Sequence, residues 1–187
     1  MAIRSFLAFE LPPHIKKEVT GISGEVKKTG LKASWVKPGN IHLTLVFLGD
    51  INEENIPEII SGIDNVTGKY EPFNIALGGM GVFPDTKRPR VLWLGLKGEI
   101  ERLASFRDDL QKPLKIFGIK QEKRSFKPHL TLGRFRKPVE EKSLLKRILD
   151  EYGDISGPNE KLNELILFKS VLNPGGSVYT KILSWSL

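Results

Sequence analysis

The chain has 187 residues, of which 40% are hydrophobic and 27% are charged, and it contains no cysteine. This composition is typical of a globular protein, and the length fits one domain or two closely associated lobes. No segment approaches the roughly 20 apolar residues of a membrane span. The lack of cysteine excludes disulfides and thiolate metal sites, and the first residues do not resemble a signal peptide, so we expect a cytoplasmic protein.

The formal net charge of +7 is concentrated in one window. Between residues 115 and 137 only Glu122 is acidic, whereas eight residues are basic: Lys115, Lys120, Lys123, Arg124, Lys127, Arg134, Arg136 and Lys137. Clustered cations attract polyanions, so the window favours a phosphate-bearing ligand. The alternative is an ordinary solvated surface.

Apolar periodicity and turn residues predict alternating strands and helices. In chain order we expect a strand at 3–9, a helix at 13–28, a strand at 41–48, a helix at 53–63, strands at 73–77 and 91–96, a helix at 99–117, a strand at 128–135, a helix at 140–152, and strands at 162–172 and 178–185. The glycine- and proline-rich segment 78–90 is predicted to be a long connection, and Asn173–Gly176 a turn. Short links between strands favour antiparallel pairing and therefore an α+β fold.

Two repeats contain two of the three histidines in the chain: His42-Leu43-Thr44-Leu45 and His129-Leu130-Thr131-Leu132. Side chains two residues apart on a strand share a face. Each histidine is therefore expected to project beside its threonine, with the leucines on the opposite face. Two such strands side by side would bring two imidazoles and two hydroxyls together.

The residues before each motif suggest an internal duplication. Trp35-Val36-Lys37-Pro38 precedes the first motif and Ser125-Phe126-Lys127-Pro128 precedes the second, although the spacing to the histidine differs. We therefore expect two similar lobes that face one another across a cleft. Because no linker separates them, residues 1–187 are expected to form a single bilobal domain.

Paired imidazoles fit general acid and general base catalysis, because the ordinary histidine pKa of about 6.5 allows one ring to be neutral and the other protonated. Thr44 and Thr131 could donate hydrogen bonds to phosphate oxygens as charge develops. A single His-x-Thr is more often a structural strand residue, but its repetition favours function. A zinc site would need a third ligand, and His14 is far away in the sequence.

With these motifs the chain resembles the two-histidine (2H) phosphoesterase superfamily, and within it the RNA 2′,3′-cyclic phosphodiesterases, also called 2′-5′ RNA ligases. The resemblance covers nearly the whole chain. It rests on residues 4–9, 35–45, 47–49, 83–84, 126–134 and 176–179.

The resemblance implies a bilobal fold with pseudo-two-fold symmetry, mostly antiparallel sheets and helices outside them. It also implies metal-independent, cofactor-free hydrolysis of a terminal 2′,3′-cyclic phosphate to a 2′-phosphate, with reversible 2′-5′ ligation. RNA ends, including those of tRNA fragments, are the implied substrates. His42 and His129 correspond to the catalytic pair, and Arg134 corresponds to a phosphate-contacting arginine. We expect a monomer without metal or membrane partners.

In an unbroken strand Arg134 would face away from His129. A bend at Gly133 would turn its guanidinium toward the phosphate, since glycine often marks a strand bulge. Formation of a 2′-phosphate requires the bond to O3′ to break. We assign His42 as the acid and His129 as the base, because nearby cations lower an imidazole pKa.

Seven residues are weaker candidates for contacts with RNA: Lys37, Lys127, Arg124, Arg88, Arg90, Phe83 and Tyr179. The cations could hold the RNA backbone and the aromatic rings could stack on a base. Each alone is more often a surface charge or a core side chain. Two alternative functions stay open: a phosphodiesterase for small cyclic nucleotides or 2′-5′ oligoadenylate, and a non-catalytic RNA-binding module.

Overall fold

The computed structural model describes residues 1–187 and contains nine strands and four α-helices. The strands are β1 (Ala2–Glu10), β2 (Ser34–Trp35), β3 (His42–Asn52), β4 (Phe73–Phe83), β5 (Val91–Gly98), β6 (His129–Arg134), β7 (Glu160–Leu162), β8 (Glu164–Asn173) and β9 (Gly176–Ser186). The helices are α1 (Pro13–Lys28), α2 (Ile56–Thr67), α3 (Ile100–Leu114) and α4 (Lys142–Glu151). None of the helices is long and apolar enough to cross a membrane.

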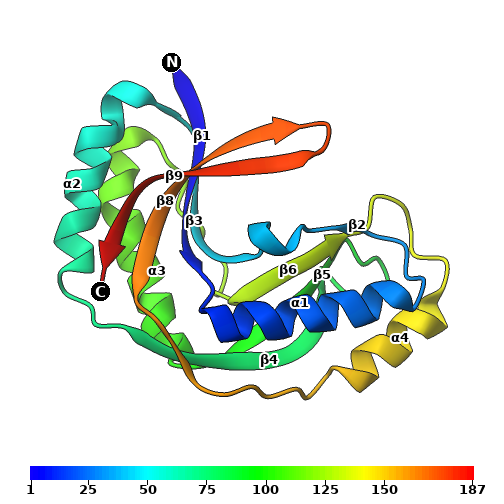
Figure 1. The fold of residues 1–187 in the computed structure, drawn as a ribbon. Coiled ribbons are helices and arrows are strands. Elements are labelled where there is room, and N and C mark those ends of the chain that lie inside the picture. The colour runs from blue at the N-terminus through cyan, green and yellow to red at the C-terminus, as the bar shows by residue number, and fades with distance from the viewer.

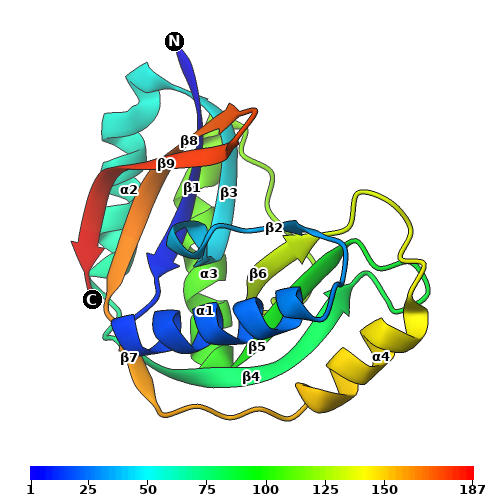
Figure 2. The ribbon, with the colours of Figure 1, turned by 45° about the vertical axis from the view of Figure 1, so that its right-hand side comes forward.

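All strands belong to one antiparallel sheet, in the order β7-β4-β5-β6-β3-β1-β8-β9, with β2 added beside β6. The sheet has two four-stranded halves, which meet where β6 lies beside β3 (Figure 1). Helix α1 crosses the β4–β6 half, whereas α2 and α3 lie against the other half (Figure 2). The expected α+β architecture of two similar halves is confirmed.

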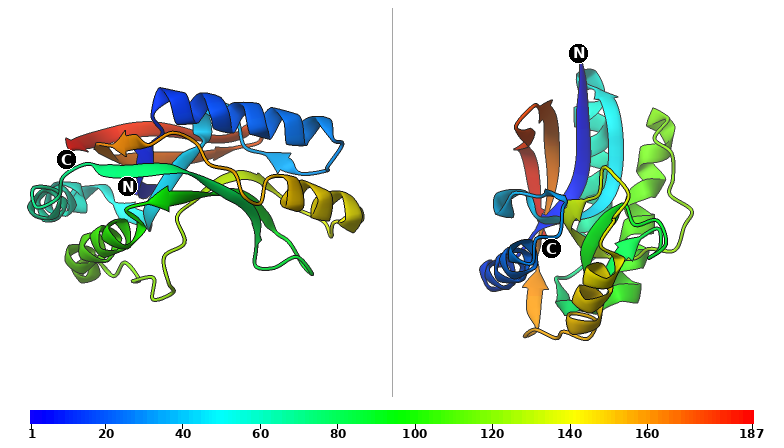
Figure 3. Two further views of the ribbon diagram at one scale, coloured as in Figure 1. Left: turned by 90° about the horizontal axis from the view of Figure 1, so that it is seen from below. Right: turned by 90° about the vertical axis from the view of Figure 1, so that its right-hand side faces the viewer.

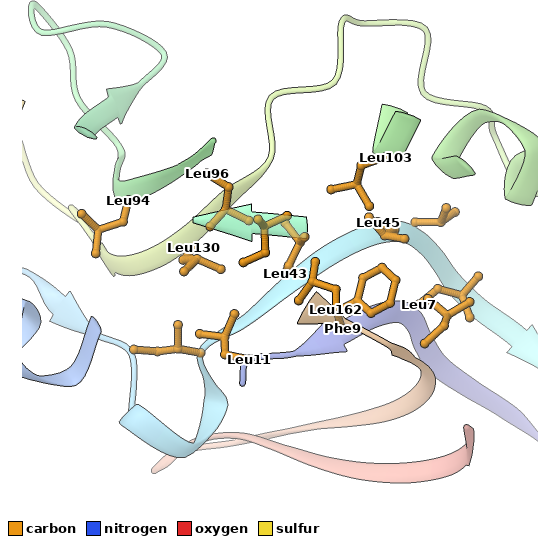
Figure 4. Close-up of a cluster of buried hydrophobic side chains, with 14 of the residues drawn as sticks. Leu7, Phe9, Leu11, Leu43, Leu45, Leu94, Leu96, Leu103, Leu130 and Leu162 are labelled. Atoms are coloured by element: carbon orange, nitrogen blue, oxygen red, sulfur yellow. The ribbon is translucent and has the colours of Figure 1, made fainter. Parts of the chain in front are cut away.

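A single cluster of 39 buried hydrophobic residues joins the two halves. Helix α1 lies on one side of the sheet in Figure 3, and α2 and α3 lie on the other. Because the sheet is strongly twisted, all three helices nevertheless contribute buried residues to this core. Leu43 and Leu130 are fully buried at its centre, among the other leucines drawn in Figure 4. The side chains next to them in each motif therefore point the other way, which is how leucine burial orients the histidines and threonines.

Helix α1 has the predicted boundaries, Pro13–Lys28. Proline suits its first position because the missing N–H needs no partner there. Ile15, Val19 and Val26 bury one face at helical spacing.

The prediction that residues 78–90 form one long connection was wrong, because β4 continues to Phe83. A bulge between Leu77 and Met80 carries the strand past its glycines. A side chain at Gly79 would clash with the backbone of Gly153, and one at Gly81 would clash with the ring of Trp93. These glycines mark close packing across a strand and not a turn.

Several other boundaries differ from the prediction. β3 continues to Asn52, four residues past its predicted end, and pairs with β1 along that length. The helix expected at 99–117 ends at Leu114 and is followed by a 3₁₀ turn. The short strands β2 and β7 were not predicted, because two or three residues carry no recognisable periodicity.

Candidate active site

The two His-x-Thr motifs begin β3 and β6, the neighbouring central strands of the sheet. Leu43 pairs with Leu130 in the antiparallel ladder, which places His42 beside Thr131 and Thr44 beside His129. The histidines therefore occupy diagonal positions, where residues are typically about 7–8 Å apart and their Cβ atoms somewhat closer. Two imidazoles at this separation leave room for a small group such as a phosphate between them.

Each imidazole is fixed by a backbone carbonyl two residues before it. His42 Nδ1 lies 2.7 Å from the Asn40 oxygen and His129 Nδ1 lies 2.8 Å from the Lys127 oxygen. A carbonyl only accepts hydrogen bonds, so each Nδ1 carries the proton and donates. Nε2 of each ring is therefore the nitrogen left for chemistry, and the two motifs orient their histidines in the same way.

Aromatic rings surround His42. Phe6 stacks on its imidazole with centroids 4.9 Å apart, and Tyr179 meets the ring edge-on at 5.2 Å. Burial is the largest influence on the His42 pKa and lowers it below the ordinary value. The Asn40 hydrogen bond and the Glu10 charge oppose this effect, and the charge of His129 adds to it. The effect of His129 on the His42 pKa agrees with the strand pairing, which places the two imidazoles near one another.

His129 has a different set of neighbours. Phe83 meets its ring edge-on at 4.9 Å, and the Trp93 ring centroid is 6.4 Å away. Burial again lowers the pKa, the Lys127 carbonyl opposes it, and the positive charge of Arg134 lowers the pKa further.

A bulge lies at the same place in each motif strand. The β5–β6 register shifts between Thr131 and Gly133, and the β1–β3 register shifts between Thr44 and Val46. The extra residue restores an outward direction to the fifth residue after each histidine. Arg134 therefore shares the exposed face of β6 with Thr131, and its charge reaches His129.

The corresponding residue in the other half is Phe47, whose side chain is 66% exposed. Its ring centroid is 6.2 Å from that of Phe6, which in turn stacks on His42. Phe47 was not predicted to be a site residue, although its spacing from His42 equals that of Arg134 from His129. The site therefore has an aromatic ring on one side and a guanidinium on the other.

The structure separates the weaker candidates for RNA contacts. Lys37, Lys127, Arg88 and Arg90 are exposed and form no ion pair. Arg124 differs, because two of its nitrogens bind the Glu122 carboxylate at 3.0 and 2.6 Å. Phe83 and Tyr179 contact the catalytic candidates His129 and His42, respectively, and so help to define the site itself.

Two further residues were not predicted from the sequence. Asn40 accepts the His42 bond with its carbonyl and donates with its side-chain amide to the Ser177 carbonyl at 2.7 Å. The bond joins residues far apart in the chain, so no local pattern signals it. Trp93 lies opposite Thr131 on β5, and its apolar character alone suggested only a core strand.

A cavity of about 520 Å³ lies at the end of β1, and neither His42 nor His129 is among its lining residues. Glu10, Glu160 and Glu164 are among its lining residues, and their charge disfavours an anionic ligand there. No group of three or more histidine, aspartate or glutamate side chains is arranged to hold a metal ion.

Known sequences match this chain over nearly its whole length. The family described as LigT like Phosphoesterase matches residues 9–93 and again residues 94–179, as a duplication requires. An RNA 2′,3′-cyclic phosphodiesterase of Archaeoglobus fulgidus is 35% identical over 95% of this chain and 96% of its own length. The enzyme of the same name from Aquifex aeolicus is 33% identical over 96% of this chain and 95% of its own length.

Solved structures agree at the level of the fold. The Thermus thermophilus protein TT0787 superposes with a TM-score of 0.81 and 26% identity, covering 99% of this chain and 98% of that one. Escherichia coli LigT in complex with 3′-AMP has a TM-score of 0.69 at 22% identity, covering 100% and 98%. The resemblance drawn from the repeated motifs is confirmed: the chain belongs to the LigT-like phosphoesterases of the 2H superfamily.

Proposed function

We propose that this protein hydrolyses the 2′,3′-cyclic phosphate at the end of an RNA strand and leaves a 2′-phosphate, without a metal or cofactor. The observation that carries the proposal is the diagonal pair of imidazoles, each with Nδ1 bonded to a carbonyl and Nε2 available. The names of the relatives support the same substrate.

The reaction needs one proton acceptor and one proton donor on opposite sides of the phosphorus. One neutral imidazole takes a proton from water through Nε2 as the water oxygen attacks phosphorus. The other, protonated imidazole gives its Nε2 proton to O3′ as the bond from phosphorus to O3′ breaks. When the 5′-hydroxyl of a second strand attacks phosphorus in place of water, the same step with the same histidine roles forms a 2′-5′ linkage and again releases O3′. In the reverse of that step the roles exchange: the 3′-hydroxyl attacks phosphorus, the 5′-hydroxyl leaves, and the 2′-5′ linkage is cleaved.

We assign His129 as the base and His42 as the acid. Burial is the main influence on both rings and lowers the pKa of each. The remaining charges differ between the two. Glu10 favours the protonated form of His42, and Arg134 favours the neutral form of His129.

Four further side chains complete the proposed site. Thr44 and Thr131 alternate with the histidines on the exposed face and can donate to the non-bridging oxygens. Arg134 stabilises the charge that develops on those oxygens. Phe47 offers a ring against which the terminal base can stack.

A direct test follows the fate of a short RNA with a 2′,3′-cyclic phosphate end, incubated with the protein in EDTA. We expect a 2′-phosphate from the wild type and at least about 100-fold slower product formation by His42→Ala and His129→Ala. His14→Ala is the matched control, because this third histidine is exposed on α1 and is paired with Glu18 and Glu160.

Three results would contradict the proposal: an unchanged RNA end, a 3′-phosphate product, or a reaction that EDTA abolishes. Turnover of a nucleoside 2′,3′-cyclic phosphate or 2′-5′ oligoadenylate without turnover of RNA would favour the small-substrate alternative. RNA binding without any turnover would favour the binding-module alternative.

A further inference from the structure

A second cationic surface begins where the active site ends. It consists of five exposed residues, which we call the hairpin patch: Lys87, Arg88, Arg90, Arg136 and Lys137. The first three lie in the turn between β4 and β5, and the last two follow β6. In Figure 2 this turn lies at the right-hand edge of the molecule, away from β8 and β9.

Backbone hydrogen bonds hold the two segments of the patch together. The Arg90 N–H donates to the Phe83 carbonyl at 2.6 Å, and the Phe135 N–H donates to the Arg90 carbonyl at 2.9 Å. The patch is therefore held in place by backbone hydrogen bonds at the end of the sheet.

No acidic side chain forms an ion pair with a cation of the patch. Asp85 is the acidic residue of the turn, and its Oδ1 accepts the backbone N–H groups of Lys87 and Arg88 at 2.8 and 2.9 Å. Its carboxylate thus shapes the turn, and none of the five patch cations forms an ion pair. Five unpaired cations on one surface are suited to a polyanion.

The other basic segment near His129 is organised differently. Residues 118–128 are fastened to α3: the buried Arg107 donates to the Glu122 and Arg124 carbonyls, and the buried Gln111 accepts the Glu122 N–H. Arg124 is paired with Glu122. This loop holds the chain that leads to the Lys127 carbonyl and His129, so its main role is structural.

The hairpin patch is continuous with the site. Phe83, at the start of the turn, contacts the His129 ring, and Val91, at its end, pairs with Arg134. A cyclic phosphate can only be the 3′ end of its strand, so the rest of the RNA must leave the site in its 5′ direction. We propose that the RNA backbone leaves past Arg134 and across the hairpin patch, so that the patch selects polymeric RNA over mononucleotides.

This inference rests on the proposed function, and its test separates the two. Lys87, Arg88 and Arg90 are changed together to glutamine. The matched control changes Lys115, Lys120 and Lys123, three exposed cations that precede His129 in the sequence, in the same way. Circular dichroism and thermal unfolding establish that both variants fold.

The first measurement uses a twelve-nucleotide RNA with an unreactive 3′-hydroxyl, so that binding is independent of turnover. We expect the triple hairpin variant to bind at least about tenfold more weakly at low salt. The slope of the logarithm of the association constant against the logarithm of the salt concentration should become less steep by about 2. Three cations are removed, and each contact with a single-strand phosphate contributes about 0.7 to the slope. The control should change neither quantity.

The second measurement compares kcat/KM for a twelve-nucleotide RNA ending in a cyclic phosphate with kcat/KM for cytidine 2′,3′-cyclic phosphate. The ratio should fall about tenfold in the hairpin variant and stay constant in the control. The inference would be overturned if both variants lost the same RNA affinity or the same kcat/KM ratio. An unchanged salt dependence of binding in the hairpin variant would also overturn it. Absence of turnover with intact patch-dependent binding would overturn the proposed function alone.

Discussion

The half of the molecule that contains His42 and the half that contains His129 share a geometry but not an electrostatic environment. Each histidine begins a central strand, donates from Nδ1 to a carbonyl two residues earlier, and is followed by a threonine and a bulge. Across the sheet, however, Glu10 is the partner of His42 and Gly95 is the partner of His129. Five residues after the histidines, the exposed side chains are Phe47 and Arg134.

This difference indicates how a duplicated unit acquires direction. Identical halves would bind a phosphate symmetrically and could not assign one histidine as the acid. In the proposed site, the Arg134 guanidinium on one side would orient the phosphate, and the Phe47 ring on the other would orient the base. The repeated residues thus supply placement, and the divergent residues supply the proposed division of roles.

The largest expected effect comes from removing either histidine and comparing the pH profiles. We expect the plot of wild-type kcat/KM against pH to be bell-shaped. The apparent pKa of each limb should lie below the ordinary histidine value of about 6.5, because burial lowers the pKa of both rings. Residual activity of His129→Ala should lose the decline at low pH, since the base is missing. Residual activity of His42→Ala should lose the decline at high pH. The opposite pattern would exchange the two roles.

The next effect tests the two divergent residues. Arg134→Ala should lower kcat/KM about 100-fold, with part of it restored by Arg134→Lys, because one donor to the developing charge is removed. NMR titration should show a raised His129 pKa, since a nearby positive charge is lost. Phe47→Ala should mainly raise KM and leave the His129 pKa in place. A shift of that pKa in the Phe47 variant instead would contradict the comparison.

A smaller effect tests how His42 is supported. Asn40→Ala removes the amide that binds the Ser177 carbonyl and so loosens the carbonyl that orients His42. We expect kcat to fall about tenfold with little change in KM, since small misplacements of a catalytic group are costly. Ser177→Ala keeps its main-chain carbonyl and should retain full activity. Equal losses in the two variants would point to general damage of the β8–β9 hairpin.

The smallest effect is on stability. Both histidines have lowered pKa values when folded, so the unfolded chain binds more protons below about pH 6.5. The stabilisation that the two histidines add to the free energy of unfolding is therefore fully present above their unfolded pKa. It is lost as the pH falls through their lower pKa values in the folded state. Urea unfolding of His42→Asn/His129→Asn should show a weaker pH dependence across this range than the wild type.

Much of the local structure was predictable from the sequence. Helix α1 and the motif strands follow from apolar spacing, because burial of one face is a local pattern. The side on which His42 and Thr44 project follows from the leucines between and after them. The glycine-rich part of β4 was mispredicted, since glycine favours turns unless a neighbouring ring or backbone requires the space.

The sequence by itself determined which groups could perform chemistry: two imidazoles, two hydroxyls and one arginine at repeated spacings. Only the tertiary structure decided that Leu43 pairs with Leu130 and so sets the histidines diagonally across one strand pair. It also brought Phe47 and Arg134 to the exposed faces of the two motif strands and joined Asn40 to Ser177. The physical reason is that side-chain periodicity depends on near neighbours, whereas strand register and long-range hydrogen bonds depend on segments that meet only after folding.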